Sequence, residues 1–203
     1  CRNFPNPSFP NNRTSCRNAA YLIGSPEKDN RKEEPLEKPA FWHNTKRYYD
    51  LKSYWRNTFG CTVYKLQIDA GFTCPNRDGS VAYGGCIYCD GRGSKLRLQG
   101  PLPTVSRQIQ DGKSYYEKLR GAKKYIAYFQ TFTNTYGPLS HLKEIYDEAL
   151  SHEDVIGLSV GTRPDCVPDP VLDLLQDYAK HHHVWIEFGL QSIHDRTLLA
   201  LNR

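Results

Sequence analysis

Hydrophobic and polar positions follow two distinct periods along most of the chain. Short runs rich in β-branched and aromatic residues predict strands over residues 62–68, 124–129, 155–160 and 184–190. Between them, apolar residues three or four positions apart predict helices. These helices are expected over residues 45–59, 104–119, 138–150 and 170–180, with a last one starting near residue 194.

The predicted strands and helices alternate along the sequence. This order favours an α/β fold whose strands are parallel and joined by right-handed crossovers, with helices on the outer face. Active groups in such sheets collect at the carboxyl ends of the strands. The unusual loops of this sequence all follow predicted strands, so we expect a functional site at that end of the sheet.

The first 40 residues show neither period. A segment dense in Asn, Pro and Ser is followed there by a run of charged residues. Such a composition buries too little apolar surface to offset the entropy lost on ordering. We therefore expect a disordered extension over residues 1–40 and an ordered domain over residues 41–203.

Composition and charge narrow the class of protein. A chain of 203 residues suits one domain, and its net charge of +5 tolerates an anionic partner such as RNA without demanding one. It contains no run of about 18 apolar residues, so we expect no membrane-spanning segment. Seven unevenly spaced cysteines do not suit a secreted disulfide scaffold. We expect a reducing compartment, the cytoplasm, and leave an organelle open.

The loop after the first predicted strand carries the strongest chemical signal. Cys86 and Cys89 form a C-x2-C pair, and eleven residues separate Cys74 from Cys86. Thiolate ligands suit iron–sulfur clusters or zinc and do not suit magnesium or calcium. Three ligands, rather than the four of an ordinary cluster, would leave one iron of a [4Fe–4S] cluster open to another ligand.

Two alternatives remain open for these cysteines. A zinc site could be completed by Cys61, Cys166 or a histidine, because C-x2-C is also a common zinc signature. The three thiols could also be unliganded. The run of three histidines ending at His183 lies where a helix gives way to a strand, and it favours a solvated helix end over a metal site.

Four separated motifs resemble one known family. The segment FTCPNRDGSVAYGGCIYC is followed by YFQTFTNTY, VGTRPDCVPD and EFGLQSIHDRTLLALNR. Together they resemble the YhcC-like radical S-adenosylmethionine (SAM) proteins, relatives of the Elongator catalytic subunit and of the oxygen-independent coproporphyrinogen dehydrogenase. The resemblance runs from about residue 48 to residue 203. It implies the N-terminal part of a radical SAM core, folded as a partial (β/α) barrel. Such cores usually have more strand–helix units, so we expect the complete parent, rather than this polypeptide, to be active.

The resemblance implies two cofactors. Cys74, Cys86 and Cys89 would hold a [4Fe–4S] cluster whose open iron binds SAM. An electron, from a donor such as flavodoxin or ferredoxin, would break the sulfonium to give methionine and a 5′-deoxyadenosyl radical. That radical would remove hydrogen from a substrate that the sequence does not identify. Relatives that modify tRNA suggest RNA, by analogy alone.

The resemblance also implies contacts to SAM, matched motif by motif. Tyr88 corresponds to an aromatic near the adenine. Gln191 and Arg203 correspond to residues that bind the ribose and the methionine carboxylate. The other expected contacts are Gln130, Thr131, Thr162 and Arg163. The sequence departs from its relatives by lacking the acid of their Gly-Gly-Glu segment and by placing Gly161 where Elongator relatives have Glu.

A second class of function fits the same residues. The chain could be a zinc- or cluster-stabilised α/β binding module that recognises RNA or a protein without catalysis. That class predicts metal binding without cleavage of SAM. A passive electron-transfer protein would require a fourth cysteine ligand, and the loop offers no good candidate.

Overall fold

The computed structural model describes residues 48–90 and 101–203. The chain divides into two units, Cys1–Asp50 and Leu51–Arg203, and nearly all the described residues belong to the second. The expected extension over residues 1–40 lies outside the described residues, as does the expected start of the ordered domain near residue 41.

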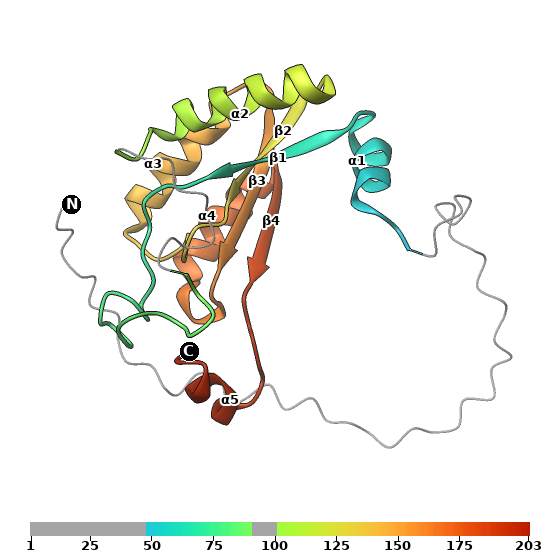
Figure 1. Cartoon of the computed structure of the whole chain (residues 1–203). Helices are drawn as coiled ribbons and strands as arrows, with labels where there is room; N and C mark the ends of the chain where they lie inside the picture. Colours follow the sequence, from blue (N-terminus) through green and yellow to red (C-terminus); the bar gives the residue numbers. More distant parts are fainter. Residues whose placement is uncertain (1–47, 91–100) are drawn as a thin grey trace, which may run out of the picture. The chain divides into compact units, whose positions relative to one another are not determined.

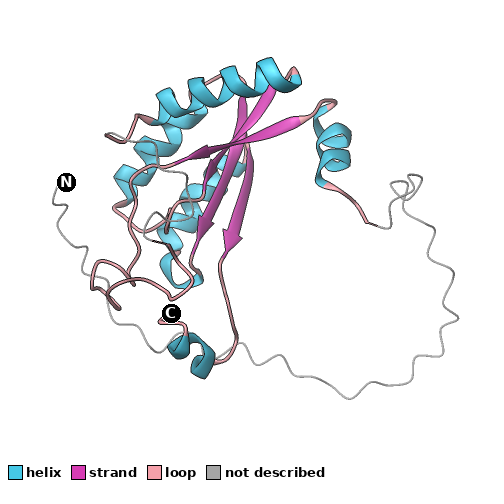
Figure 2. Cartoon of the chain, in the orientation of Figure 1, coloured by secondary structure: helices cyan, strands magenta, loops and turns pink. Residues whose placement is uncertain are grey.

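The centre of the second unit is one parallel sheet. Within the described residues it contains β1 (Val63–Ile68), β2 (Lys124–Phe129), β3 (Val155–Thr162) and β4 (His183–Phe188), paired in sequence order. Each neighbouring pair is parallel (Figure 2). The expected α/β fold with a parallel sheet is confirmed. β3 continues two residues beyond its expected end, and β4 ends two residues before its own.

Three helices lie between consecutive strands and cover one face of the sheet. These are α2 (Val105–Arg120), α3 (Leu139–Leu150) and α4 (Asp169–Ala179) (Figure 1). A short α5 (Asp195–Ala200) follows β4. A 3₁₀ helix at Pro164–Cys166, which the sequence did not predict, follows β3 directly. None of the helices in the described residues is both long enough and apolar enough to cross a membrane.

The ends of α2 show why the sequence specifies its length. The Thr104 side chain accepts a hydrogen bond from the backbone N–H of Arg107, at 3.2 Å, and so caps the first turn. Such a cap contributes about 1 kcal/mol. Gly121 ends the helix in the left-handed conformation, with φ 59°, and its N–H bonds to the Glu117 carbonyl.

The main core lies between this helical layer and the sheet. Alternate side chains of each strand point into it, among them Phe129 of β2 and Leu158 of β3. They meet Ile109 of α2, Leu142 of α3 and Leu175 of α4, all of them buried. Burying one such side chain contributes roughly 1.5–3 kcal/mol.

The opposite face of the sheet is covered near the amino ends of the strands by α1 (Leu51–Phe59). Trp55 of this helix stacks on Trp185 of β4, with ring centroids 4.9 Å apart. The helix was expected to begin at residue 45, but residues 48–50 are not helical, and residues 45–47 lie outside the described part of the chain. Asp50 stands just before the first helical residue, where Asp is a favoured cap.

His183 corrects a second expectation. It is the first residue of β4, not part of a solvated helix end. Its ring meets Trp55 edge-on at 5.4 Å and Phe59 at 5.5 Å. The sequence suggested solvation because the helix ends nearby, but β4 begins early enough to turn this ring inward. We call Tyr54, Trp55, Phe59, His183 and Trp185 the aromatic cluster.

Candidate functional site

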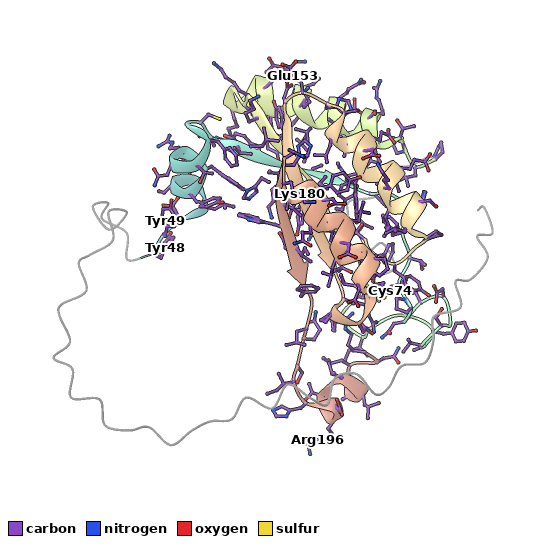
Figure 3. The ribbon with its side chains drawn as sticks, turned by 180° about the vertical axis from the view of Figure 1, so that it is seen from behind. Tyr48, Tyr49, Cys74, Glu153, Lys180 and Arg196 are labelled. Atoms are coloured by element: carbon purple, nitrogen blue, oxygen red, sulfur yellow. The ribbon has the colours of Figure 1, made fainter. Side chains whose placement is uncertain are left out.

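Loops from distant parts of the sequence meet at the carboxyl ends of the strands. The loop after β1 and the segment around α5 lie together there, below the arrowheads in Figure 1. The Ile87 N–H bonds to the Leu201 carbonyl at 3.1 Å, and the Thr133 N–H bonds to the Thr73 carbonyl at 3.2 Å. Seen from behind in Figure 3, Cys74 lies toward this end of the sheet, and Glu153, in the turn before β3, lies toward the other.

These loops enclose a cavity of about 410 Å³. That volume is typical of a pocket for a small molecule or cofactor. The expected site residues that line it are Cys74, Cys86, Cys89, Tyr88, Gln130, Thr162, Arg163, Gln191 and Arg203. Thr131 is buried and does not line the cavity.

The cysteine loop is folded by its own backbone. The Cys74 carbonyl accepts hydrogen bonds from the N–H groups of Arg77, at 2.8 Å, and Asp78, at 3.2 Å. The Cys89 N–H bonds to the Cys86 carbonyl at 2.9 Å, which bends the C-x2-C segment into a tight turn. Cys74 and Cys86 are buried, while Cys89 is partly exposed. All three thiols therefore face the same cavity from a loop of defined shape.

Each of the three sulfur atoms has an N–H donor beside it. Arg163 Nη1 donates to Cys74 Sγ at 3.8 Å, and Asn76 Nδ2 donates to Cys86 Sγ at 3.6 Å. Arg77 Nη1 donates to Cys89 Sγ at 3.7 Å. Burial raises the pKa of the Cys89 thiol, although the Arg77 cation opposes that shift. The surroundings of the sulfur atoms are thus rich in donors and positive charge.

Asn76 joins these groups to the end of the chain. Its side chain is fully buried, and its Oδ1 accepts a hydrogen bond from Arg163 Nη1 at 2.5 Å. Its Nδ2 also donates to the carbonyl of Asn202. Asn202 in turn donates from Nδ2 to the carbonyls of Gly85, at 2.7 Å, and Tyr83, at 3.2 Å. This clasp fastens the segment after α5 to the cysteine loop.

Arg163 is held by an ion pair with its near neighbour Asp165. Nε donates to one carboxylate oxygen at 2.8 Å and Nη2 to the other at 2.5 Å. Burial alone would lower the pKa of the guanidinium, but the Asp165 carboxylate outweighs it and raises that pKa. Burial alone would raise the pKa of Asp165, and Arg163 outweighs it and lowers that pKa. Both groups are therefore charged at neutral pH.

The segment after β2 is shaped mainly by buried hydrogen bonds. Asn134 Nδ2 donates to the carbonyls of Phe129, at 3.0 Å, and Gly161, at 2.8 Å. This clamp ties the carboxyl end of β2 to that of β3. A side chain at Gly161 would place its Cβ 3.2 Å from the Phe129 carbonyl oxygen, a tight contact. The close approach of the two strands gives a local reason for glycine at this position.

A polar network lies on the face of the sheet toward the cavity. Glu187 lines the cavity and accepts hydrogen bonds from Lys65 at 2.5 Å, Ser159 at 2.8 Å and Tyr128 at 2.9 Å. Burial alone would raise the pKa of Glu187, but hydrogen bonds from Lys65, Ser159 and Tyr128 outweigh it and lower that pKa. The carboxylate is therefore ionised at neutral pH.

Backbone strain also concentrates around the cavity. In the described part of the chain, the residues other than Gly with positive φ are Phe132 at 64°, Gln191 at 67° and Asn202 at 54°. Such conformations cost energy in non-Gly residues, most of all in a bulky residue such as Phe132. Phe132 and Gln191 both line the cavity, and Asn202 belongs to the clasp.

Sequence reasoning missed several residues of this site. Arg77, Phe132 and Glu187 line the cavity, and Asn76 supports it from behind. Asn76 and Arg77 follow Cys74 closely in the sequence, which was a usable signal. Glu187 precedes the Gly-Leu-Gln segment and reads in sequence as an ordinary strand residue.

The cysteine thiols of the described residues do not gather closely enough to ligate a single metal ion. The five cysteines of the described residues are free. Within those residues, no group of three His, Cys, Asp or Glu side chains could hold one metal ion. Zinc requires all its sulfur ligands within about 2.3 Å of one point. A polynuclear cluster instead takes its thiolates on different irons. Cys61, weighed above as a fourth zinc ligand, packs against the aromatic cluster.

Comparisons with known proteins relate the chain to longer proteins. No family model matches it. The uncharacterized protein YtqA of Bacillus subtilis is 43% identical over 166 residues, which cover 81% of this chain and 52% of that protein. The protein YhcC of Escherichia coli strain K12 is 41% identical over 153 residues, which cover 71% of this chain and 46% of that protein.

A third similar protein is the uncharacterized protein MJ0486 of Methanocaldococcus jannaschii. It is 39% identical over 152 residues, which cover 74% of this chain and 46% of that protein. The chain spans about half the length of the curated relatives it matches. The similarity therefore relates this chain to one part of each longer protein.

Proposed function

We propose that the cavity holds a [4Fe–4S] cluster on Cys74, Cys86 and Cys89 together with SAM, and that the protein containing this chain is a radical SAM enzyme. When bound, these cofactors supply a carbon-centred radical that removes hydrogen from a substrate. One observation carries the proposal. Three thiols and six of the seven expected SAM-binding residues line a single cavity at the carboxyl ends of parallel strands.

The chain's own side chains suit an amino-acid-bearing nucleotide. Arg203 reaches the cavity while its Nη2 donates to the Gly189 carbonyl, which orients the guanidinium. A guanidinium carries five N–H donors, so others remain to pair with a carboxylate. Tyr88, half-exposed at the cavity, offers an aromatic face for a base. Gln191 adds an amide that can both donate and accept.

We also propose that the four-stranded sheet is the first part of a (β/α) barrel. Its strands follow one another in sequence order, its crossover helices lie on one face, and its cavity lies at the carboxyl ends. These are the features of barrel enzymes, whose active sites are built from the loops at that end. Reduction of the cluster would require an external donor, such as flavodoxin or ferredoxin, and a compartment that keeps the thiols reduced.

The proposal is tested by anaerobic reconstitution of the 203-residue chain with iron and sulfide. Bound iron and sulfide are measured first, and 5′-deoxyadenosine is then measured after addition of dithionite and SAM. We expect a brown protein with about four irons per chain. Cys86→Ala should lose most of this iron. The matched control is Cys61→Ala, which changes a cysteine in contact with the aromatic cluster and should retain the iron.

The two readouts separate the competing functions. Release of 5′-deoxyadenosine that Cys86→Ala abolishes would support the enzyme. A colourless protein that holds one zinc and leaves SAM intact would overturn it and favour the binding module. YtqA, treated in the same way, tests a longer protein of which this chain matches 52%.

A further inference from the structure

The sulfur atoms of Cys74, Cys86 and Cys89 each have a hydrogen-bond donor beside them. Each sulfur accepts an N–H bond from a different side chain: Arg163 for Cys74, Asn76 for Cys86 and Arg77 for Cys89. Two of these donors carry a full positive charge. The Arg163 charge is balanced by its bidentate pair with Asp165. Arg77 has no ion pair among the described residues, so of these two cations it has the greater net charge beside its sulfur atom.

The Arg77 side chain is held in place from two further sides. A Cβ at Gly85 would stand 2.6 Å from Arg77 Nη1 and 3.4 Å from its Cγ, so the side chain occupies space that any other residue there would fill. Gly85 has φ 83°, a conformation that also favours glycine. On another side, the guanidinium carbon lies 5.2 Å from the centre of the Phe132 ring, a cation–π contact.

This placement has a consequence for electron transfer. One-electron reduction adds a negative charge to an iron–sulfur cluster and its thiolates. A nearby cation and N–H bonds to the sulfur atoms stabilise that added charge, and such bonds are among the features that set cluster potentials. Because Arg77 borders the cavity itself, little protein separates its charge from the site.

We infer that Arg77 is a positioning residue that raises the reduction potential of the centre, acting through the sulfur of Cys89. Asn76 and Arg163 donate N–H bonds to the other two sulfur atoms without an unbalanced charge. This inference rests on the proposed function, since it requires a cluster on the three thiols. It assigns Arg77 to the cluster, a role that the sequence motifs did not suggest.

The test is an anaerobic redox titration of the reconstituted chain, followed by the electron paramagnetic resonance signal of the reduced cluster. Arg77→Gln removes the charge but keeps an amide donor. We expect its midpoint potential to fall by an amount equal to at least a tenfold change in the reduction equilibrium, or about 59 mV. Arg77→Lys keeps the charge and should shift less. Arg107→Gln, which removes an exposed α2 cation paired with Asp111, should leave the potential unchanged.

Each result bears on a different claim. If the unmodified chain takes up no iron, the proposed function itself fails. If that chain loads a cluster and Arg77→Gln has the same potential, this inference alone is overturned. Loss of the cluster from both Arg77 variants, with the far-ultraviolet circular dichroism unchanged, would also overturn it and assign Arg77 to cluster assembly.

Discussion

The two ends of the same sheet differ in what covers them. Near the amino ends of the strands, α1 packs the aromatic cluster onto the face opposite the three crossover helices, with Trp55 in contact with Val63 and Ile126. At the carboxyl ends, the equivalent face opens into a cavity lined by cysteines, arginines and Glu187. The same four strands therefore carry an aromatic end and a polar, strained end.

The change from one end to the other takes place along single strands. On this face of the sheet, the positions of β1 run from Val63, which is buried, to Lys65 and Gln67. Lys65 pairs with Glu187 at the midpoint of the face, and Gln67 donates to Gln130 beyond it at 2.8 Å. Apolar packing thus holds the strands together where no chemistry is expected, which lets strained and charged groups occupy the other end.

The largest expected loss of stability comes from Trp55→Ala at the aromatic end of the sheet. The indole is 3% exposed, so its removal deletes most of the aromatic cluster's contact area and leaves a cavity. We expect a loss of about 3–5 kcal/mol in the free energy of unfolding, measured by urea titration. Trp55→Phe, which keeps an aromatic ring, should lose much less. An unfolding free energy equal to that of the unmodified chain would show that α1 contributes little to stability.

An intermediate effect is expected from Asn76→Leu at the other end. Leucine has the same branching as asparagine, although it is somewhat larger, and it leaves Arg163 Nη1 and the Asn202 carbonyl each without this buried partner. We expect a loss of about 1–3 kcal/mol. Hydrogen exchange should show faster exchange of the Ile87 and Gly85 amides, which bond within the clasp and the cysteine loop.

The matched control for that variant is Gln110→Leu, on the exposed surface of α2. It should change neither the unfolding free energy nor the exchange of the loop amides. If Asn76→Leu instead left the exchange rates of the Ile87 and Gly85 amides unchanged, the clasp would have no part in holding the cysteine loop.

The smallest expected effect is a pH dependence of stability that arises from His183 in the aromatic cluster. Burial lowers the pKa of His183, and its Nε2 has no hydrogen-bond partner among the described residues. The unfolded chain therefore binds a proton at this ring more readily than the folded chain. Above pH 6.5, about the ordinary pKa of histidine, the ring is neutral in both states and the free energy of unfolding is unaffected by its titration. As the pH falls below that value, the unfolded chain takes up the proton first, so the free energy of unfolding should decrease.

The measurement is the urea midpoint at about pH 7 and about pH 5 for the unmodified chain and for His183→Phe. The variant should gain relative to the unmodified chain as the pH falls, because it has no ring to protonate. His181→Gln, at an exposed position, should show no such gain. If the midpoints of the unmodified chain and of His183→Phe differed by the same amount at both pH values, the burial of His183 would not lower its pKa.

The sequence predicted the order of strands and helices more fully than it predicted their ends or every residue of the site. The strand order and the crossover helices could be predicted because apolar periodicity reports locally on which face is buried. The start of α1 and the end of β4 could not, since those boundaries depend on packing against other strands. Among the site residues, nine of the ten expected ones line the cavity, whereas Thr131 is buried outside its lining.

By itself, the sequence determined the alternation of strands and helices and the end of the sheet at which unusual loops gather, and it predicted a functional site in the cysteine loop. Only the tertiary structure decided which N–H group faces each sulfur, and that Glu187 and Arg77 share one cavity. The physical reason is the separation along the sequence over which each kind of interaction acts. Periodicity and turn chemistry act between neighbours in the chain, whereas these contacts join residues up to 126 positions apart, as in the Asn76–Asn202 clasp. Such contacts exist only after strand register and loop packing are complete.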